Sequence, residues 1–320
     1  MRTTRSEENL STVLIPGISG TNMENFLLIF ILLIFGIIIK PLKLFPDNAA
    51  HVLNLFVIYV PLPALVLLNI PKLSFSRELI IPVLLPWVMI LLSVILIIIL
   101  SKVFSWRRSI TGGLLLVVPL GNTSFLGIPM IKAFFGESHI PYAILYDQFG
   151  SFLALATYGS IVLALYGSSK KPGIMDIVKR VVYFPPFISL ILALILRFWT
   201  YPPIAVSVLQ MASQTLVPVV MFAVGLQISF RLPRSVVSPM IWGLLIKLVL
   251  APLAALAICS ALGIFTAPAK VSIFEAGMGP MITAGALAII ADLEPELMAS
   301  MVGLGIALSF LTLPVLFRFM

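Results

Sequence analysis

The chain has 320 residues, of which 61% are hydrophobic and only 10% are charged. A soluble domain is about 45–50% apolar and about 25% charged, so this composition excludes a soluble globular protein and predicts an all-α polytopic membrane protein. The net charge of +8 comes from Lys and Arg in short loops between apolar segments. The positive-inside rule explains that pattern without nucleic acid as a partner. A single cysteine and two histidines leave no disulfide framework and no zinc-type metal site.

Residues 1–24 form a polar tail without the long apolar core of a signal peptide, and Met23 offers an alternative start. Ten apolar segments follow, and we expect each to cross the lipid bilayer as a helix. Their approximate ranges are 25–40, 49–70, 79–104, 109–136, 140–167, 177–199, 204–228, 239–262, 267–293 and 297–319.

A polar linker, residues 168–176, divides the spans into two sets of five, residues 25–167 and 177–320. Three residues recur in the second half with the same residue type, each 155 positions further along: Pro63 and Pro218, Trp87 and Trp242, and Gly150 and Gly305. An odd number of spans in each copy forces the copies into opposite orientations. The sequence therefore predicts two inverted five-helix repeats, the plan of many secondary transporters.

The fourth and ninth spans both contain residues that interrupt helices. Gly121, Asn122 and Thr123 precede Gly127-Ile128-Pro129, and the ninth span contains Gly277, Gly279 and Pro280. Lipid cannot hydrogen-bond the backbone that such a break frees, so it survives only beside protein or a cavity. Half-helices beginning near Asn122 and Pro280 would direct N-terminal N–H groups at the cavity, which suits a carboxylate.

The expected substrate site therefore comprises Gly121, Asn122, Thr123, Gly277, Gly279 and Pro280, with Gln214 near Pro218 as a further lining residue. Asn122 and Thr123 can alternatively serve only to cap the broken helix. Gln214 can alternatively make an interhelical hydrogen bond.

Acidic residues inside spans are expensive and mark candidate coupling sites. Glu275, just before Gly277, is the first candidate, and Asp147 with Gln148 in the fifth span is the second. The expected coupling ion is H⁺ or Na⁺, with a candidate Na⁺ site near Glu275 and Asn122, and no other cofactor is expected. The alternatives are a structural acid paired with a lysine and a solvated acid at the interface. Lys247 in the eighth span is expected to snorkel or to form a salt bridge.

At Asn122-Thr123-x-x-x-Gly127-Ile128-Pro129-x-x-Lys132-x-x-x-Gly136 the chain resembles the auxin efflux carrier family, which includes plant PIN-type carriers and bacterial carboxylate permeases. The segment Glu275-Ala276-x-Met278 followed by Pro280 resembles the family's ninth-span crossover, with one additional residue, Gly279. The resemblance extends over nearly the whole chain from about residue 25, and the short linker is similar to that of bacterial members.

The resemblance implies a ten-helix fold similar to bile acid–sodium symporters, with broken helices 4 and 9 crossing as an X. Helices 1, 2, 6 and 7 would form a scaffold domain, and helices 3–5 and 8–10 a transport domain that slides against it as an elevator. A homodimer through the scaffold is also implied.

The sequence thus predicts a secondary active transporter, working in symport, of a small organic anion such as malate, malonate or an auxin-like acid. The Lys and Arg bias places this multi-pass protein in the cell membrane with both termini outside. The chain contains no phosphate-binding loop and no nucleophile–base–orienter set, so neither ATP-driven transport nor an enzyme is expected. A cation/proton antiporter, or a membrane sensor or channel, on the same fold is the alternative.

Overall fold

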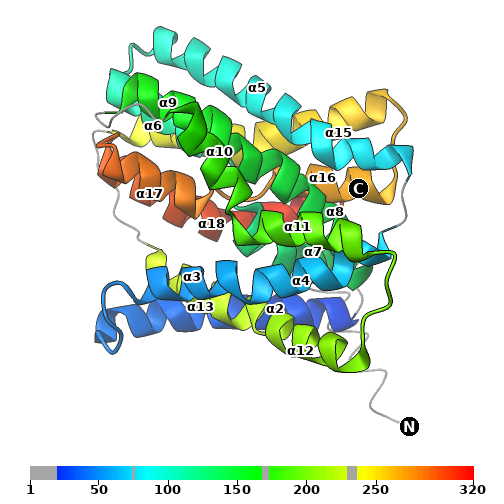
Figure 1. Cartoon of the computed structure of the whole chain (residues 1–320). Coiled ribbons are helices and arrows are strands. Elements are labelled where there is room, and N and C mark those ends of the chain that lie inside the picture. The colour runs from blue at the N-terminus through cyan, green and yellow to red at the C-terminus, as the bar shows by residue number, and fades with distance from the viewer. Residues whose placement is uncertain (1–19, 74–75, 168–172, 229–235) are drawn as a thin grey trace, which may run out of the picture.

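The computed structural model describes residues 20–73, 76–167, 173–228 and 236–320, and within them the regular structure is helical (Figure 1). Six helical stretches are long and apolar enough to cross a membrane: Ala49–Lys72, Arg77–Val103, Glu137–Tyr166, Pro203–Gln227, Val237–Ala261 and Pro295–Phe317. Four shorter apolar helices accompany them: Phe26–Leu42, Arg108–Val117, Thr123–Phe135 and Pro185–Leu196. The prediction of an all-α, multi-pass membrane protein is confirmed.

The first group of helices comprises the lower layer in Figure 1 and one further helix, α11, which lies just above that layer and packs against it. Its members are α2 (Gly20–Ile39), α3 (Ala49–Tyr59), α4 (Pro61–Asn69), α11 (Pro185–Leu196), α12 (Pro203–Gln214) and α13 (Leu216–Gln227). Helix α2 packs along α13, and α4 packs against both α11 and α12. Residues from the two halves of the chain therefore interleave in this group.

The remaining helices form the second group. They are α5 (Ile80–Val103), α6 (Arg108–Val117), α7 (Ile128–Phe135), α8 (Ile140–Tyr146), α9 (Ser160–Tyr166), α14 (Val237–Leu245), α15 (Ala251–Ala261), α16 (Ala267–Ala276), α17 (Ile282–Ile290) and α18 (Pro295–Phe317). Helix α16 packs against α5, α8 and α15, and α17 packs against α6 and α18. The two groups meet where α7 packs on α2.

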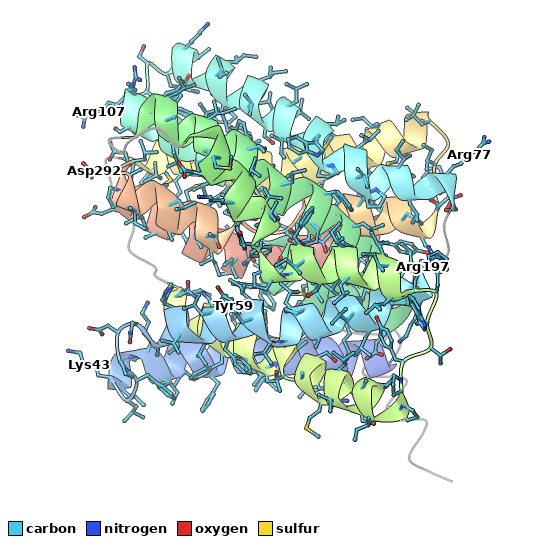
Figure 2. All side chains as sticks on the ribbon, in the orientation of Figure 1. Lys43, Tyr59, Arg77, Arg107, Arg197 and Asp292 are labelled. Carbon is cyan, nitrogen blue, oxygen red and sulfur yellow. The ribbon has the colours of Figure 1, made fainter. Side chains whose placement is uncertain are left out.

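Short elements join these helices. The 3₁₀ turns are Lys40–Leu42, Ile70–Lys72, Arg77–Leu79 and Glu137–His139, and the π segments are Thr123–Gly127, Asp147–Phe152, Leu155–Gly159 and Ile246–Leu250. Helix α10 (Ile174–Val182) precedes α11. Figure 2 shows Lys43, Arg107 and Asp292 at one end of the helical bundle and Arg77 and Arg197 at the other. The described part of the bundle thus has two charged ends, as a membrane-spanning protein requires.

Proline divides three expected spans into shorter helices. The second span breaks at Val60, before Pro61, where the prolines predict a bend. The expected single helix over residues 177–199 is wrong in its continuity, because α10 ends at Val182 and α11 begins at Pro185. The seventh span breaks at Thr215, with Pro218 in the first turn of α13. In each case proline removes a backbone donor that a continuous helix would need, and it is tolerated in a first turn.

Two glycines let α2 and α13 pack with their backbones in contact. A Cβ atom on Gly36 would lie 2.4 Å from the carbonyl oxygen of Phe222, and one on Gly225 would lie 2.3 Å from that of Leu33. Both distances are well inside van der Waals contact. Small residues at such a crossing provide close packing between helices in lipid, where no hydrophobic driving force exists.

We predict that Gly225→Val destabilises the protein, because the added side chain must separate α2 from α13. Overpacking of this kind costs about 1–3 kcal/mol. Thermal unfolding in detergent, followed by tryptophan fluorescence, measures the effect. Ala257→Val, on the exposed face of α15, is the matched control and should leave the melting temperature unchanged. Equal melting temperatures for the two variants would contradict the prediction.

Candidate functional site

Two helix breaks lie at the centre of the second group. Helix α6 ends at Val117, and the chain continues without regular structure through Pro119 and Gly121 before the π segment that leads into α7. Helix α16 ends at Ala276, and α17 begins only at Ile282. Proline and glycine explain both breaks. Proline lacks the backbone N–H that a helix needs, and glycine loses the most conformational entropy when it is held in a helix.

The two breaks pair with one another through their backbones. Gly121 and Pro280 form an antiparallel bridge. The Asn122 N–H donates to the Gly279 carbonyl at 2.8 Å, and the Met281 N–H donates to the Leu120 carbonyl at 2.9 Å. These bonds satisfy backbone groups that lipid could not satisfy. They also fix the register of the two segments.

On one side of this pairing lies a cluster of buried polar side chains around Asp147. The Thr123 hydroxyl donates to Asp147 Oδ1 at 2.6 Å, and the Gln148 amide donates to Asp147 Oδ2 at 2.7 Å. The neighbouring Asn122 amide nitrogen Nδ2 is buried and has no hydrogen-bond partner among the described residues, as is also true of the carbonyl oxygen of Gln148. Buried polar atoms are normally bonded, so Asn122 is free to bind a ligand.

A cavity of about 110 Å³ opens beside Asn122. Ser124 and Asp147 line it from the π segments that adjoin α7 and α8 of the second group. Leu62 of α4 and Phe184, the residue before α11, line it on the side of the first group. The rings of Phe152 and Phe184 stack across this boundary with centroids 3.8 Å apart. The cavity therefore lies at the interface between the two groups of helices, and we call it the crossover cavity.

On the opposite side of the pairing lies Glu275, which is fully buried. Both of its carboxylate oxygens lack a hydrogen-bond partner among the described residues. A Cβ atom on Gly127 would lie 2.3 Å from Glu275 Oε2 and 2.6 Å from Oε1. The glycine of the fourth-span motif thus makes room for the carboxylate of the ninth span, and no other residue fits there without displacing it.

Lys247, in the π segment Ile246–Leu250, is the third buried ionisable group at the breaks. Its ammonium donates to the carbonyl oxygen of Ala276 at 3.3 Å, at the C-terminus of α16. A cation is favoured there by the helix dipole and by the free carbonyl groups. With Glu275, Gly121 and Tyr146 it lines a cavity of about 10 Å³, which is about the space that one water molecule needs.

The structure brings together most, but not all, of the predicted site residues. Gly121, Asn122, Thr123, Gly279 and Pro280 meet at the pairing, and Asp147 and Gln148 join them through Thr123. Two predicted residues lie elsewhere. Gly277 faces Leu316 and Pro252, away from the crossover cavity, and Gln214 lines a separate cavity between α4 and α12.

The predicted coupling residues divide between the two sides. Asp147 lines the crossover cavity, whereas Glu275 lines the small cavity with Lys247. Asn122 and Glu275 accordingly face different cavities. Lys247 neither snorkels to the end of the bundle nor bonds the carboxylate of Glu275, since it donates to a backbone carbonyl.

Three residues at the site were missed by sequence reasoning about side-chain chemistry. Ser124 and Thr283 line the crossover cavity, and Gly127 contacts Glu275. A hydroxyl in the first turn after each break was the signal that could have identified Ser124 and Thr283. For Gly127 the motif gave the position, but only the contact with Glu275 of helix α16 explains why it is glycine.

A membrane protein with two paired helix breaks and a polar cavity at the pairing belongs to the transporter class. The model of a family described as membrane transport protein matches residues 21–172 and 173–317. The chain is 30% identical over 298 residues to an uncharacterized transporter from Methanothermobacter thermautotrophicus, covering 91% of this chain and 96% of the relative. It is 29% identical over 303 residues to an uncharacterized transporter from Methanocaldococcus jannaschii, with the same two coverages.

The chain therefore belongs to the membrane transport protein family. The resemblance to auxin efflux carriers, drawn from the fourth-span motif, is confirmed. The protein is a transporter and not an enzyme.

The contact between Gly127 and Glu275 generates a double-mutant prediction. Gly127→Ala should destabilise the protein, because the methyl group overlaps the buried carboxylate. In a Glu275→Ala background, where the carboxylate is absent, the same substitution should cost much less, because contacting residues couple energetically. Melting temperatures of the four proteins in detergent give the coupling directly. Additive effects would show that Gly127 and Glu275 do not touch.

Proposed function

We propose that this protein is a secondary active transporter of a small organic anion, a carboxylate such as malate, malonate or an auxin-like acid. The observation that carries the proposal is the crossover cavity. There the unpartnered amide of Asn122 lies at the start of one half-helix, and α17 begins beside it at Ile282. Two helix N-termini and an amide donor provide N–H groups and positive dipole ends for a carboxylate without a buried arginine.

The proposed architecture is ten membrane spans in two inverted five-helix repeats. The six long stretches, together with Phe26–Leu42 and Pro185–Leu196, supply eight crossings. The broken pairs α6 with α7 and α16 with α17 would supply the fourth and the ninth. The breaks fall in the fourth and the ninth expected spans, which are the corresponding positions of the two halves. An inverted repeat pairs such spans at a central site, and the antiparallel bridge between Gly121 and Pro280 supports that relation.

An elevator mechanism is supported by how the site is distributed over the two helix groups. The polar residues of the crossover cavity come from the second group, as Asn122 and Asp147 do, whereas the first group contributes apolar residues such as Leu62. A second group that slides past an apolar surface can carry its ligand with it. The first group would then be the scaffold domain and the second the transport domain, with both termini outside the cell membrane.

Coupling to H⁺ or Na⁺ is proposed to pass through Glu275 and Asp147. Both carboxyls are buried, and a second negative charge beside an anion site would repel the substrate. A proton or cation that arrives with the substrate removes this repulsion, so symport follows from the charge balance. The two buried acids also favour a second candidate, a cation/proton antiporter, in which no organic anion moves.

Uptake into liposomes tests the proposal. The reconstituted protein is supplied with labelled malate, malonate, lactate and indole-3-acetate, with and without a Na⁺ or pH gradient. Saturable uptake of one acid, stimulated by one gradient, is the expected result. Cation flux without movement of any acid would instead support the antiporter.

Asn122→Ala should reduce uptake of the transported acid at least about tenfold, because a hydrogen bond to a charged group contributes about 1.5–3 kcal/mol. The change removes a donor that has no partner in the protein, so the melting temperature should stay close to that of the wild type. Asn48→Ala, at an exposed position before α3, is the control and should transport normally. Intact uptake by Asn122→Ala would reduce the motif to a structural role.

Glu275→Gln should abolish the dependence of uptake on the coupling gradient while leaving the fold intact, because glutamine has nearly the same shape and no titratable proton. The measurement is uptake at a series of pH values and Na⁺ concentrations. Glu296→Gln, an exposed acid in the first turn of α18, should retain the wild-type dependence. Unchanged coupling in Glu275→Gln would remove this residue from the mechanism.

A further inference from the structure

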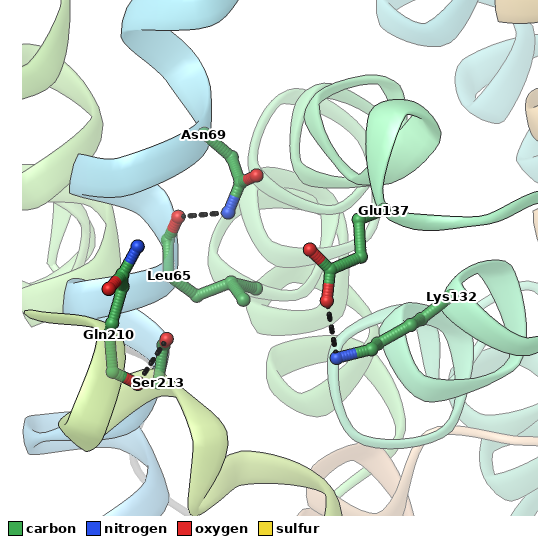
Figure 3. Close-up of polar contacts among 6 residues, drawn as sticks. All are labelled: Leu65, Asn69, Lys132, Glu137, Gln210 and Ser213. Carbon is green, nitrogen blue, oxygen red and sulfur yellow. Dashed lines mark hydrogen bonds and ion pairs between the residues drawn. The ribbon is translucent and has the colours of Figure 1, made fainter. Parts of the chain in front are cut away.

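A second cavity, larger than the crossover cavity, lies at the end of the bundle where α4 and α7 end. Its volume is about 560 Å³, which is within the usual range for small-molecule sites. Figure 3 shows Asn69, Gln210 and Ser213 on one wall and the Lys132–Glu137 pair on the other. The two walls belong to the two helix groups, and we call this cavity the vestibule.

Three charged residues line the vestibule among those described: Lys72, Lys132 and Glu137. The Lys132 ammonium contacts Glu137 Oε1 at 2.6 Å, and the charge of Lys72 also acts on Glu137. One carboxylate therefore faces two ammonium groups. The balance leaves a net positive charge at this opening, which attracts anions and raises their local concentration.

Local backbone geometry explains why Glu137 reaches Lys132. Gly136 ends α7 with a φ of 87°, a conformation that favours glycine, and the chain turns there at once. Glu137 then lies over the last turn of the helix that carries Lys132. The pair is half open to water, with 35% of the Lys132 side chain and 71% of the Glu137 side chain exposed. An exposed pair of this kind contributes only about 0–1 kcal/mol, so a competing carboxylate can replace it.

Neutral groups complete a site for an organic ligand. The Tyr201 hydroxyl lines the vestibule and is buried without a hydrogen-bond partner among the described residues. Gln210 projects into the same space, and Trp199 presents an exposed ring beside it. A ligand with one carboxylate and a small polar or flat apolar body would meet an ammonium, polar donors and an aromatic face here.

Apolar side chains separate the vestibule from the crossover cavity. Leu62 and Phe125 line the crossover cavity, and Leu65 and Ile128, one turn further along the same segments, line the vestibule. All four are buried. The vestibule is thus a separate binding position rather than an extension of the crossover cavity.

We propose that the vestibule is a second binding site for the organic anion, in which the substrate carboxylate replaces the Glu137 carboxylate on Lys132. This inference rests on the proposed transport of an organic anion and names where that anion first binds. Glu137 acts as an internal competitor that occupies the ammonium until the substrate arrives. Lys132 and Lys72 provide the attraction, and the substrate leaves toward the crossover cavity when the apolar residues part.

A binding experiment on the purified full-length protein tests the site without transport. Malonate and lactate are titrated while tryptophan fluorescence is recorded, and malonamide serves as the uncharged control. The part of the signal that Trp199→Phe removes reports on the vestibule. Saturable quenching by the anions but not by malonamide is expected.

Two substitutions then have opposite expected effects on that binding. Lys132→Gln should raise the half-saturating concentration about tenfold, the change that a lost charge-assisted contact of about 1.4 kcal/mol produces. Glu137→Gln should lower it about threefold or more, because the competitor loses its charge. Lys102→Gln, an exposed lysine in the last turn of α5, controls for a lost positive charge and should bind as the wild type does. The inference is overturned if Lys132→Gln behaves like Lys102→Gln, or if Glu137→Gln fails to tighten binding.

Liposome uptake with the same variants separates this inference from the proposed function. If the wild type moves an acid and Lys132→Gln leaves its KM unchanged, the vestibule site is wrong and the transporter stands. If the fluorescence titration shows the site but no acid is moved by any variant, the proposed transport is wrong and the site stands. The expected result is a change in KM with little change in the maximal rate, since neither substitution touches the crossover cavity.

Discussion

The backbone pairing between Gly121 and Pro280 is the interaction on which the rest of the site depends. Two helices end inside a protein that lies in lipid, and each end leaves N–H and C=O groups that lipid cannot satisfy. The two breaks bond to one another instead. Because both segments are held by the same bonds, the side chains that flank them are fixed in position, with Asn122 on one side and Glu275 on the other.

The buried ionisable groups at the centre of the protein lie on different sides of this pairing. Asp147, Glu275 and Lys247 are all buried near the breaks, although an ionisable group in a membrane span is costly. Each has a different environment. Asp147 accepts hydrogen bonds from two side chains, and Lys247 donates to a carbonyl at a helix C-terminus. Glu275 packs against Gly127 and has no hydrogen-bond partner among the described residues. The carboxylate with the fewest partners is the one whose charge is easiest to neutralise by a proton or cation, which is the basis of its proposed role in coupling.

The two cavities at the interface between the helix groups lie on opposite sides of an apolar layer. The crossover cavity is small, and the stacked rings of Phe152 and Phe184 form part of its wall. The vestibule is larger, positively charged and open at the end of the bundle. In the proposed transport cycle the two sides must never be connected at once, and buried residues such as Leu62 and Leu65 would provide that separation. In the proposed elevator mechanism, movement of one helix group along the other would open this layer without breaking the backbone pairing, because both breaks belong to the same group.

Local sequence determined the membrane class, most span boundaries and the positions of the two breaks, because apolar length, proline and glycine act within a few residues of themselves. The motif around Asn122 also determined the family. Tertiary structure alone decided which break residues face the ligand cavity, as the placement of Gly277 and Gln214 demonstrates. It also decided that Glu275 and Asp147 lie on different sides, and that Glu137 contacts Lys132 at a second cavity. Such partners depend on how segments far apart in the chain cross, and residue periodicity carries no record of the angle at which two helices meet.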